Sequence, residues 1–389
     1  MVARFKDAEQ VKLNVILPTN EVGGHEKMLL EWLSRAREFG LQPTVYCRSG
    51  WSLATMISGR GIKLEEVRYR VRGRQFSRLV RWANFFETYR IATHLPREVP
   101  ILLAPGSMHA SILHLLACVL ANRSIVCYVP TAHNAATESL KLSRLRDRIA
   151  LWLGRRVIIW ITIGPLQKSQ LEEYWRLVRP VVTIPNRIEV MQGNRPERAK
   201  AVKRSDCMTI GYIGRFEPKA KGLDWLERIL RVGIQQRDQF SFVFQGQGEF
   251  LDSLVSLSER NSVRSVTVVP WGDTQNGLQA IDVLILTSRF EGFPLVAVEA
   301  LMAGVPVVAT RESGLCDVLP EWCVFSFGDE AGMWRSLERL RDPVLRDEAI
   351  HYGTGRLEEI LSDENYVKGI SDVVNALRIS AARCADVVR

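Results

Sequence analysis

A repeated alternation between short apolar runs and amphipathic helical patterns is the feature that most constrains the fold of this chain. Residues 12–17 (KLNVIL) form an apolar run with the length of a buried strand, and a glycine pair follows at Gly23 and Gly24. Residues 26–39 then place apolar side chains on one helical face until Gly40 stops the helix. A strand, a glycine loop and a helix in this order predict the start of a parallel α/β sheet.

The same alternation continues along the chain and is interrupted once. The N-terminal part has predicted strands at 44–47, 100–104, 124–129 and 157–163 and helices at 108–121 and 138–153. After a proline-containing stretch, a second series has strands at 208–213, 240–244, 265–269, 282–287 and 305–309 and helices at 222–236, 248–260 and 294–303. Two α/β domains are therefore predicted, over 1–180 and 181–374. Loops that follow parallel strands share one edge of a sheet, so ligand sites are expected at those edges.

Composition agrees with a globular enzyme of two domains. The 389 residues are 47% hydrophobic and 24% charged, and no apolar run approaches the roughly 18–20 residues that span a bilayer. The N-terminus lacks the apolar core of a secretory signal, so a cytoplasmic location is expected. Seven cysteines without a CxxC pair indicate reduced thiols rather than a zinc site. The net charge of +9 favours an anionic partner. Composition alone does not distinguish a membrane surface, an anionic substrate and nucleic acid.

Residues 288–310 (SRFEGFPLVAVEALMAGVPVVAT) are the most informative segment. A strand leads into a glycine-containing turn and then into a helix that begins near Pro294, where free backbone N–H groups favour a phosphate or sugar oxygen. Glu291 lies in the loop and Glu299 just over one turn into the helix, so both can face one ligand. The alternative is a capping carboxylate and a solvated helical glutamate. The apolar neighbours of Glu299 favour the first interpretation, because a carboxylate among them needs a partner.

Three further segments carry candidate ligand contacts. In GYIGRFEPKAKGLDWL (211–226), Arg215 and Lys221 stand near a helix start and suit a diphosphate; the alternative is a solvated basic loop. The glycine pair at 23–24 allows close approach of a ligand, or is only a tight turn. His133 follows a predicted strand, although a lone histidine is more often structural. No Asp-x-Asp pattern occurs in the chain, so no metal-binding signature of that kind is present.

The segment EGFPLVAVEALMAGVPVVAT resembles the E-x7-E motif of retaining family 4 glycosyltransferases (glycosyl transferases group 1), with Pro294 where many members have glycine. The stretches at 211–226, 20–29, 183–189 (TIPNRIE) and 244–250 (FQGQGEF) resemble further family motifs in the same order. The resemblance implies the GT-B fold: two Rossmann-like domains whose parallel sheets face a central cleft. It also implies that the C-terminal helix, about 375–389, returns to the N-terminal domain.

The resemblance implies a role for each matching residue. Glu291 would hold the donor sugar, and Glu299 would hold the ribose hydroxyls. Arg215 and Lys221 would bind the diphosphate, with Lys219 a weaker third cation. The sugar and phosphate would also meet the backbone of Gly292, Phe293, Pro294, Leu295 and Val296, and the phosphate would meet the amides of Gly23 and Gly24. His133 would lie near the donor sugar, with His109 and His25 as rivals. The catalytic set is then His133, Glu291, Arg215 and Lys221, with no metal and no cofactor.

The implied activity is retaining transfer of a sugar from a nucleotide-diphosphate sugar to a glycan or lipid-linked acceptor, in the assembly of cell-surface polysaccharide, lipopolysaccharide or glycolipid. One alternative is a GT-B relative with different chemistry, an epimerase or a phosphorylase. Another is a basic nucleic-acid-binding protein, which the donor-site motifs disfavour, so no nucleic-acid partner is expected.

A membrane contact is also predicted. Residues 138–156 (ESLKLSRLRDRIALWLGRR) read as a helix with apolar and basic faces, and a second basic stretch runs from Arg68 to Arg81. Such segments favour peripheral binding to anionic lipid, here the inner face of the cytoplasmic membrane. The alternative is a helix packed on the core with a solvated polar face.

Overall fold

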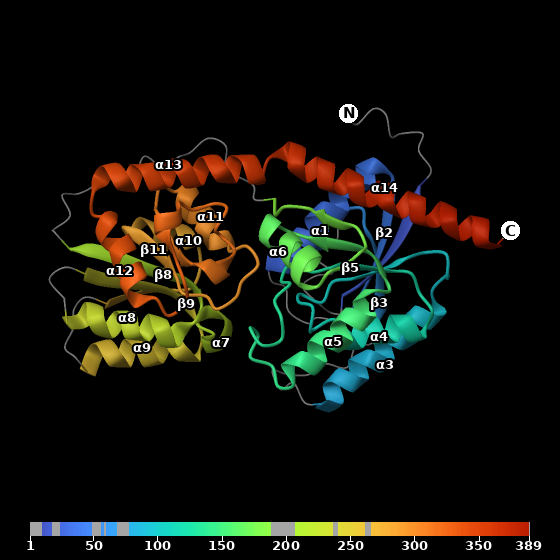
Figure 1. Cartoon of the computed structure of the whole chain (residues 1–389), viewed down its shortest axis with the longest axis horizontal. Coiled ribbons are helices and arrows are strands. Elements are labelled where there is room, and N and C mark those ends of the chain that lie inside the picture. The colour runs from blue at the N-terminus through green and yellow to red at the C-terminus, as the bar shows by residue number, and fades with distance from the viewer. Residues whose placement is uncertain are drawn as a thin grey trace. The chain divides into compact units, whose positions relative to one another are not determined.

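The computed structural model describes residues 10–17, 24–48, 56–57, 60–67, 78–187, 207–235, 240–260 and 266–388. These residues form two compact units, one within Met1–Arg187 and Leu361–Arg389 and the other within Ile188–Ile360 (Figure 1). The sequence suggested boundaries at 180 and 374. In the structure the chain instead returns to the first unit at Leu361, because the last helix packs against that unit through buried residues between Tyr366 and Leu377.

The first unit is built on a seven-stranded sheet in which every strand pair is parallel. Its strands are β1 (Val11–Ile16), β2 (Leu41–Arg48), β3 (Lys63–Val67), β4 (Ile101–Leu103), β5 (Ile125–Tyr128), β6 (Val157–Thr162) and β7 (Val181–Thr183). Their order is β3-β2-β1-β4-β5-β6-β7. The strands β4, β5 and β6 are buried almost throughout, as expected for a parallel sheet with helices on both faces.

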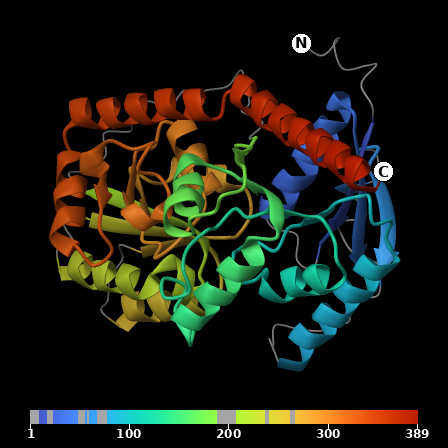
Figure 2. The same cartoon turned by 45° about the vertical axis from the view of Figure 1, so that its right-hand side comes forward.

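Helices cover both faces of this sheet. They are α1 (Gly24–Ala36), α3 (Arg78–His94), α4 (Ile112–Leu120), α5 (Ser143–Gly154), the short α6 (Pro165–Ser169) with the π-helical turn η3 (Gln170–Tyr174), and α14 (Asp363–Val388). α3, α4 and α5 lie side by side in both views (Figures 1 and 2). α14 packs on α1 and near β1, β6 and β7, with Ile370, Val373, Val374 and Leu377 fully buried.

The second unit has a six-stranded sheet, again with parallel pairs only. Its strands are β8 (Met208–Arg215), β9 (Phe240–Gln247), β10 (Val266–Val269), β11 (Val283–Leu286), β12 (Val307–Thr310) and β13 (Val324–Phe325). Their order is β10-β9-β8-β11-β12-β13. The helices are α7 (Pro218–Lys221), α8 (Leu223–Gln235), α9 (Glu249–Arg260), α10 (Thr274–Gln279), α11 (Leu295–Met302), α12 (Glu330–Arg339) and α13 (Pro343–Ile360).

Each sheet has one point where the strand order reverses, between β1 and β4 and between β8 and β11. Ligands of open α/β sheets bind beside the carboxyl ends of the strands at such a point. Arg215 ends β8, Glu291 follows β11, and His133 follows β5. The fold therefore brings the residues singled out in the sequence to the ligand-binding edge of their own sheet.

One predicted helix is shorter than expected. The pattern over 138–156 suggested a continuous helix, but α5 begins only at Ser143, because Leu142 has a left-handed backbone with φ of 56°. Residues such as Leu140 and Lys141 lie in the preceding turn. Within the described ranges, no helix has both the length and the apolarity needed to cross a membrane.

Candidate functional site

The junction of α7 and α8 brings Lys221 to the end of β11. Gly222 follows Lys221 with φ of 61°, and a Cβ atom there would lie 2.0 Å from the carbonyl oxygen of Thr287. Thr287 Oγ1 donates to the carbonyl of Lys221 at 2.8 Å, and Arg289 N donates to that of Ala220 at 2.8 Å. Only glycine fits this close approach of two backbones, which holds Lys221 beside the loop after β11.

Glu291 is the partner of Lys221 at this position. Lys221 Nζ contacts Glu291 Oε1 in an ion pair whose side chains are 20% and 17% exposed. Ser288 Oγ donates to the other oxygen, Glu291 Oε2, at 2.8 Å. The backbone N–H of Glu291 donates to the carbonyl of Glu312 at 3.1 Å. The pair thus presents a fixed cation and a fixed carboxylate that neutralise each other without a ligand.

Arg215 supplies a second cation at the same edge. It is the exposed last residue of β8, and among the described residues its guanidinium has no ion-pair partner. Tyr212 Oη donates to the carbonyl of Arg215 at 3.1 Å. Burial, and next the charge of Glu291, raises the pKa of the Tyr212 hydroxyl well above its usual range, so it remains a donor. At the end of β9, a Cβ on Gly246 would lie 1.9 Å from the carbonyl of Gly214.

The start of α11 offers backbone donors. The helix begins at Leu295, and Pro294, at the N-cap with φ of −71°, has no side chain that could cap the first turn. Gly292 is half-buried, Phe293 is buried, and Leu295 and Val296 are half-buried. Amides of an uncapped first turn remain directed outward along the helix axis, where they favour an anion.

Glu299 has surroundings different from those of Glu291. It is half-buried in α11, and its Oε2 is buried without a hydrogen-bond partner. Burial raises the pKa of the Glu299 carboxyl; a hydrogen bond with Thr274 opposes this effect, and the nearby Asp273 adds to it. A carboxylate oxygen in this position is ready to accept a hydrogen bond from a ligand hydroxyl, since leaving it unpaired is costly.

In the first unit, the glycine pair lies partly outside the described residues, because Gly23 is not among them and Gly24 is the first residue of α1. His25 stacks on Tyr128 with ring centroids 5.2 Å apart, and burial lowers its pKa against the opposing effect of Glu26. His133 is 7% exposed, and its Nδ1 lies 3.3 Å from Gln170 Nε2.

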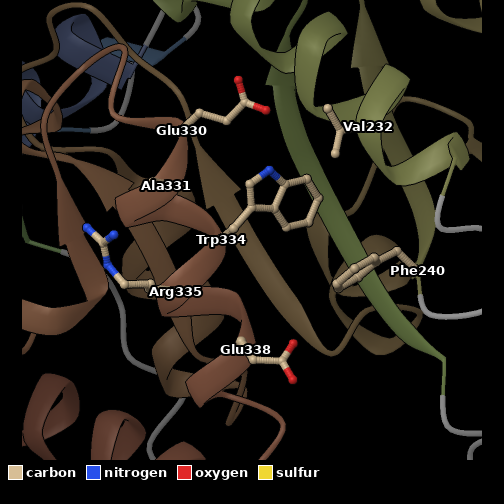
Figure 3. Close-up of a pocket in the computed structure, with 7 residues that line it drawn as sticks. All are labelled: Val232, Phe240, Glu330, Ala331, Trp334, Arg335 and Glu338. Atoms are coloured by element: carbon tan, nitrogen blue, oxygen red, sulfur yellow. The ribbon is translucent and has the colours of Figure 1, made fainter.

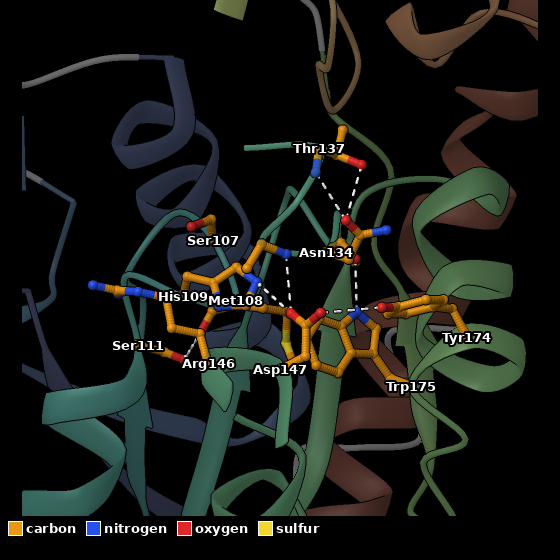
Figure 4. A network of polar contacts seen from close by, with 12 residues as sticks. Ser107, Met108, His109, Ser111, Asn134, Thr137, Arg146, Asp147, Tyr174 and Trp175 are labelled. Atoms are coloured by element: carbon orange, nitrogen blue, oxygen red, sulfur yellow. Dashed lines mark hydrogen bonds and ion pairs between the residues drawn. The ribbon is translucent and has the colours of Figure 1, made fainter. Parts of the chain in front are cut away.

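His109 belongs to a network that surrounds the His133 loop (Figure 4). Its ring is 5.7 Å from that of Trp175, and its Nε2 lies 3.2 Å from Asp147 Oδ1. Burial lowers the pKa of His109, which Asp147 partly offsets. Of the three histidines considered, His109 is therefore the one whose ring packs among the residues that support the loop.

Sequence reasoning missed several residues that complete these contacts. Ser288 and Thr287 directly follow β11, and Asp273 and Thr274 begin α10. Ser288 is the first residue of the segment singled out at 288–310, whereas Thr287 ends a predicted strand and Asp273 and Thr274 lie in no motif of the sequence analysis. Lys219 lies in α7, but its side chain is outside the described part, as is the basic stretch between Arg68 and Arg74.

A cavity of about 490 Å³ lies elsewhere in the second unit (Figure 3). It is lined by α12 residues such as Trp334 and by Phe240, whose rings lie 5.1 Å apart. Phe240 is the first residue of β9, so this cavity lies at the opposite end of the strands from Arg215 and Glu291. It is therefore separate from the candidate site. In the ranges described, no group of three or more His, Cys, Asp or Glu side chains is arranged to hold a metal.

Comparison with known proteins finds similarity that is centred on the second unit. Residues 207–342 match the family model for glycosyl transferases group 1. The lipopolysaccharide core biosynthesis glycosyltransferase LpsE of Rhizobium meliloti is 26% identical over 216 residues, which are 52% of this chain and 59% of LpsE.

Two solved structures share the fold of almost the whole chain. HepE of Anabaena, in complex with UDP-glucose, has a TM-score of 0.68 at 15% identity and covers 94% of this chain and 100% of its own. Sucrose-phosphate synthase of Thermosynechococcus elongatus has a TM-score of 0.71 at 15% identity, covering 95% and 100%. The chain spans less than half of the length of the first curated relatives it matches. Residues 207–342 thus resemble the glycosyl transferases group 1 family, within a chain that has the predicted GT-B fold.

Proposed function

We propose that the protein transfers a sugar, with retention of anomeric configuration, from a nucleotide-diphosphate sugar to a glycan or lipid-linked acceptor in cell-surface polysaccharide, lipopolysaccharide or glycolipid assembly. The observation that carries the proposal is the Lys221–Glu291 pair, held beside Arg215 and the uncapped start of α11. The names of two relatives support the pathway class: LpsE, and the Vi polysaccharide biosynthesis protein of Salmonella typhi, 32% identical over 115 residues. HepE bound to UDP-glucose supports a nucleotide-sugar donor.

In this proposal, each group acts on a different part of the donor. Arg215, Lys221 and the amides from Gly292 onward neutralise the charge that develops on the leaving diphosphate. Glu291 accepts hydrogen bonds from sugar hydroxyls and fixes the sugar for attack. Glu299 accepts a ribose hydroxyl at its unpaired oxygen. His133 is a further residue with a proposed catalytic role, and no metal takes part.

A donor screen tests this function. We expect one of the UDP-, GDP- or ADP-sugars to raise the melting temperature, because a ligand at a hundred times its Kd stabilises the folded state by about 2.7 kcal/mol. Product analysis with a labelled donor then checks the reaction. Transfer with retained configuration supports the proposal, whereas an isomerised donor indicates an epimerase and dependence on inorganic phosphate a phosphorylase. Absence of any shift or turnover across the donors would contradict the function.

We further propose that this transferase contacts an anionic membrane through the outer side of α3, α4 and α5. In α5, Ala150 and Leu153 face the core, while Leu145, Ile149 and Trp152 are 52%, 38% and 56% exposed. Exposed large apolar side chains continue on the neighbouring helices as Trp82, Phe86 and Tyr89 of α3 and Leu120 of α4. The apolar residues of the predicted helix therefore divide between a core-facing and an outward-facing set.

Basic side chains lie next to the outward-facing apolar set. Those exposed on α5 or directly beside it are Lys141, Arg144, Arg148, Arg155 and Arg156. Aromatic and aliphatic side chains flanked by arginine match the boundary between acyl chains and anionic headgroups. Each basic residue near such a surface contributes about 1 kcal/mol of attraction.

Co-sedimentation with vesicles tests the membrane contact. We expect the protein to pellet with phosphatidylcholine vesicles that contain phosphatidylglycerol and not with pure phosphatidylcholine, and to be released by salt because exposed charges are screened. The double variant Ile149→Ser/Trp152→Ser should bind several times more weakly. Ile379→Ser, which removes an exposed apolar side chain from α14, is the matched control. Equal pelleting with both vesicle types at low salt would rule out this contact.

A further inference from the structure

The loop that carries His133 is followed by a turn, in which the carbonyls of Asn134 and Ala135 accept from Glu138 N at 3.2 Å and Leu140 N at 2.8 Å. On its N-terminal side, Thr131 Oγ1 donates to the carbonyl of Gly106 at 2.8 Å. On its C-terminal side, Asn134 Oδ1 accepts from the backbone and hydroxyl of Thr137 at 2.8 and 3.1 Å. In addition to these contacts, side chains from other elements bind the backbone around His133.

Two such side chains hold the backbone on either side of His133. Trp175 Nε1 donates to the carbonyl of Ala132 at 2.7 Å, and Ala135 N donates to Asp147 Oδ1 at 3.0 Å. Trp175 follows η3 and is 2% exposed, whereas Asp147 projects from α5. Figure 4 shows both side chains reaching the loop, one from each element.

The Asp147 carboxylate joins four elements. Besides Ala135, it accepts from Tyr174 Oη at 3.2 Å through Oδ2, and its Oδ1 lies 3.2 Å from Nε2 of His109 in the turn before α4. The His109 ring in turn packs against Trp175. His109 and Tyr174 each contact both the Asp147 carboxylate and the Trp175 ring, so the two anchors are linked through these side chains.

We propose that Asp147 and Trp175 are positioning residues that fix His133 for its part in sugar transfer. The proposal rests on the proposed function for the role of His133, but the positioning itself is a property of the first unit alone. Neither side chain needs to touch the substrate. Because catalytic geometry tolerates little displacement, releasing either anchor lowers the rate of the chemical step while donor binding in the second unit persists.

NMR of the full chain with labelled histidine rings tests the positioning directly. The chain has six histidines, whose signals can be assigned by single substitution. In Asp147→Ala, the His133 signals should shift or broaden, while those of the exposed His94 and His351 stay unchanged. Asp147→Asn keeps an acceptor for Ala135 N and should restore the wild-type His133 signals. Tyr352→Phe, which removes the hydroxyl of an exposed tyrosine on α13 of the second unit, is the matched control.

Kinetics provide the second measurement, with UDP-glucose as the first probe and the release of UDP as the readout. We expect Asp147→Ala and Trp175→Phe to lower kcat about tenfold or more and to change the affinity for UDP less than twofold. Tyr352→Phe should remain within twofold of wild type for both quantities. If Asp147→Ala does not fold, Trp175→Phe, which retains a buried ring, is the variant that tests the proposal. Unchanged His133 signals in the folded variants would overturn the proposal. If the wild-type protein turns over no nucleotide sugar, the proposed function fails, yet the NMR comparison still decides the positioning.

Discussion

Replacing Glu291 by alanine should remove most sugar transfer without weakening the binding of the free nucleoside diphosphate. The free diphosphate has no sugar for Glu291 to hold, and the substitution releases Lys221 from its ion pair, so affinity should stay the same or rise slightly. Transfer loses the charged contacts that fix the sugar. A lost contact of this kind costs on the order of 2–4 kcal/mol in the transition state.

Glu299→Ala should have the opposite effect on binding, because it should lower the affinity for the free nucleoside diphosphate. Its unpaired Oε2 is assigned to the ribose, so its removal should weaken the diphosphate itself by about 1.5–3 kcal/mol. Calorimetry with the free diphosphate, beside initial rates with the donor, separates the two variants. Glu321→Ala, in an exposed carboxylate paired with Arg311, is the control and should match wild type. Equal loss of diphosphate affinity in the two variants, or full activity of Glu291→Ala, would show that these roles are wrong.

Lys221→Ala should lower both transfer and diphosphate affinity. Lys221 is the cation that the Gly222 junction fixes beside the loop after β11, where the proposed function places the diphosphate, and removing one such stabilising group lowers kcat by about 10²–10³-fold. Lys368→Ala, on the surface of α14, is the matched control.

Because Arg215 and Lys221 take the place of a divalent ion in this proposal, wild-type activity should survive excess EDTA. Initial rates with and without the chelator measure this. Complete loss of activity that magnesium or manganese restores would contradict the assignment of the two cations.

The parallel α/β architecture could be predicted because buried strands and amphipathic helices alternate with clear periodicity. The pattern is weak where the structure has short or polar elements. β3, with the sequence KLEEV, is an edge strand with mostly polar side chains. α3 has apolar residues on more than one face. The start of α5 depends on the left-handed backbone of Leu142, which a periodicity argument does not detect.

The donor-site motifs could be located because each follows a strand and contains glycines or charges in a characteristic order. Which residues of these motifs contact each other could not be predicted from their spacing in the sequence. Lys221 and Glu291 are 70 residues apart and meet only because β8 and β11 are neighbours in the sheet. The supports of the His133 loop, Asp147 and Trp175, are likewise set by the packing of α5 and η3 and have no local sequence pattern. The roles given to these residues remain predictions.

The path of the chain through the two units has a consequence for folding order. All of the second unit precedes α14 in the sequence, whereas α14 covers α1 of the first unit with Ile370, Val373, Val374 and Leu377. During synthesis, the second unit can therefore fold while the first unit still exposes the apolar surface that awaits its last helix. The first unit is then the part of the nascent chain most in need of protection from aggregation, although its strands emerge from the ribosome first.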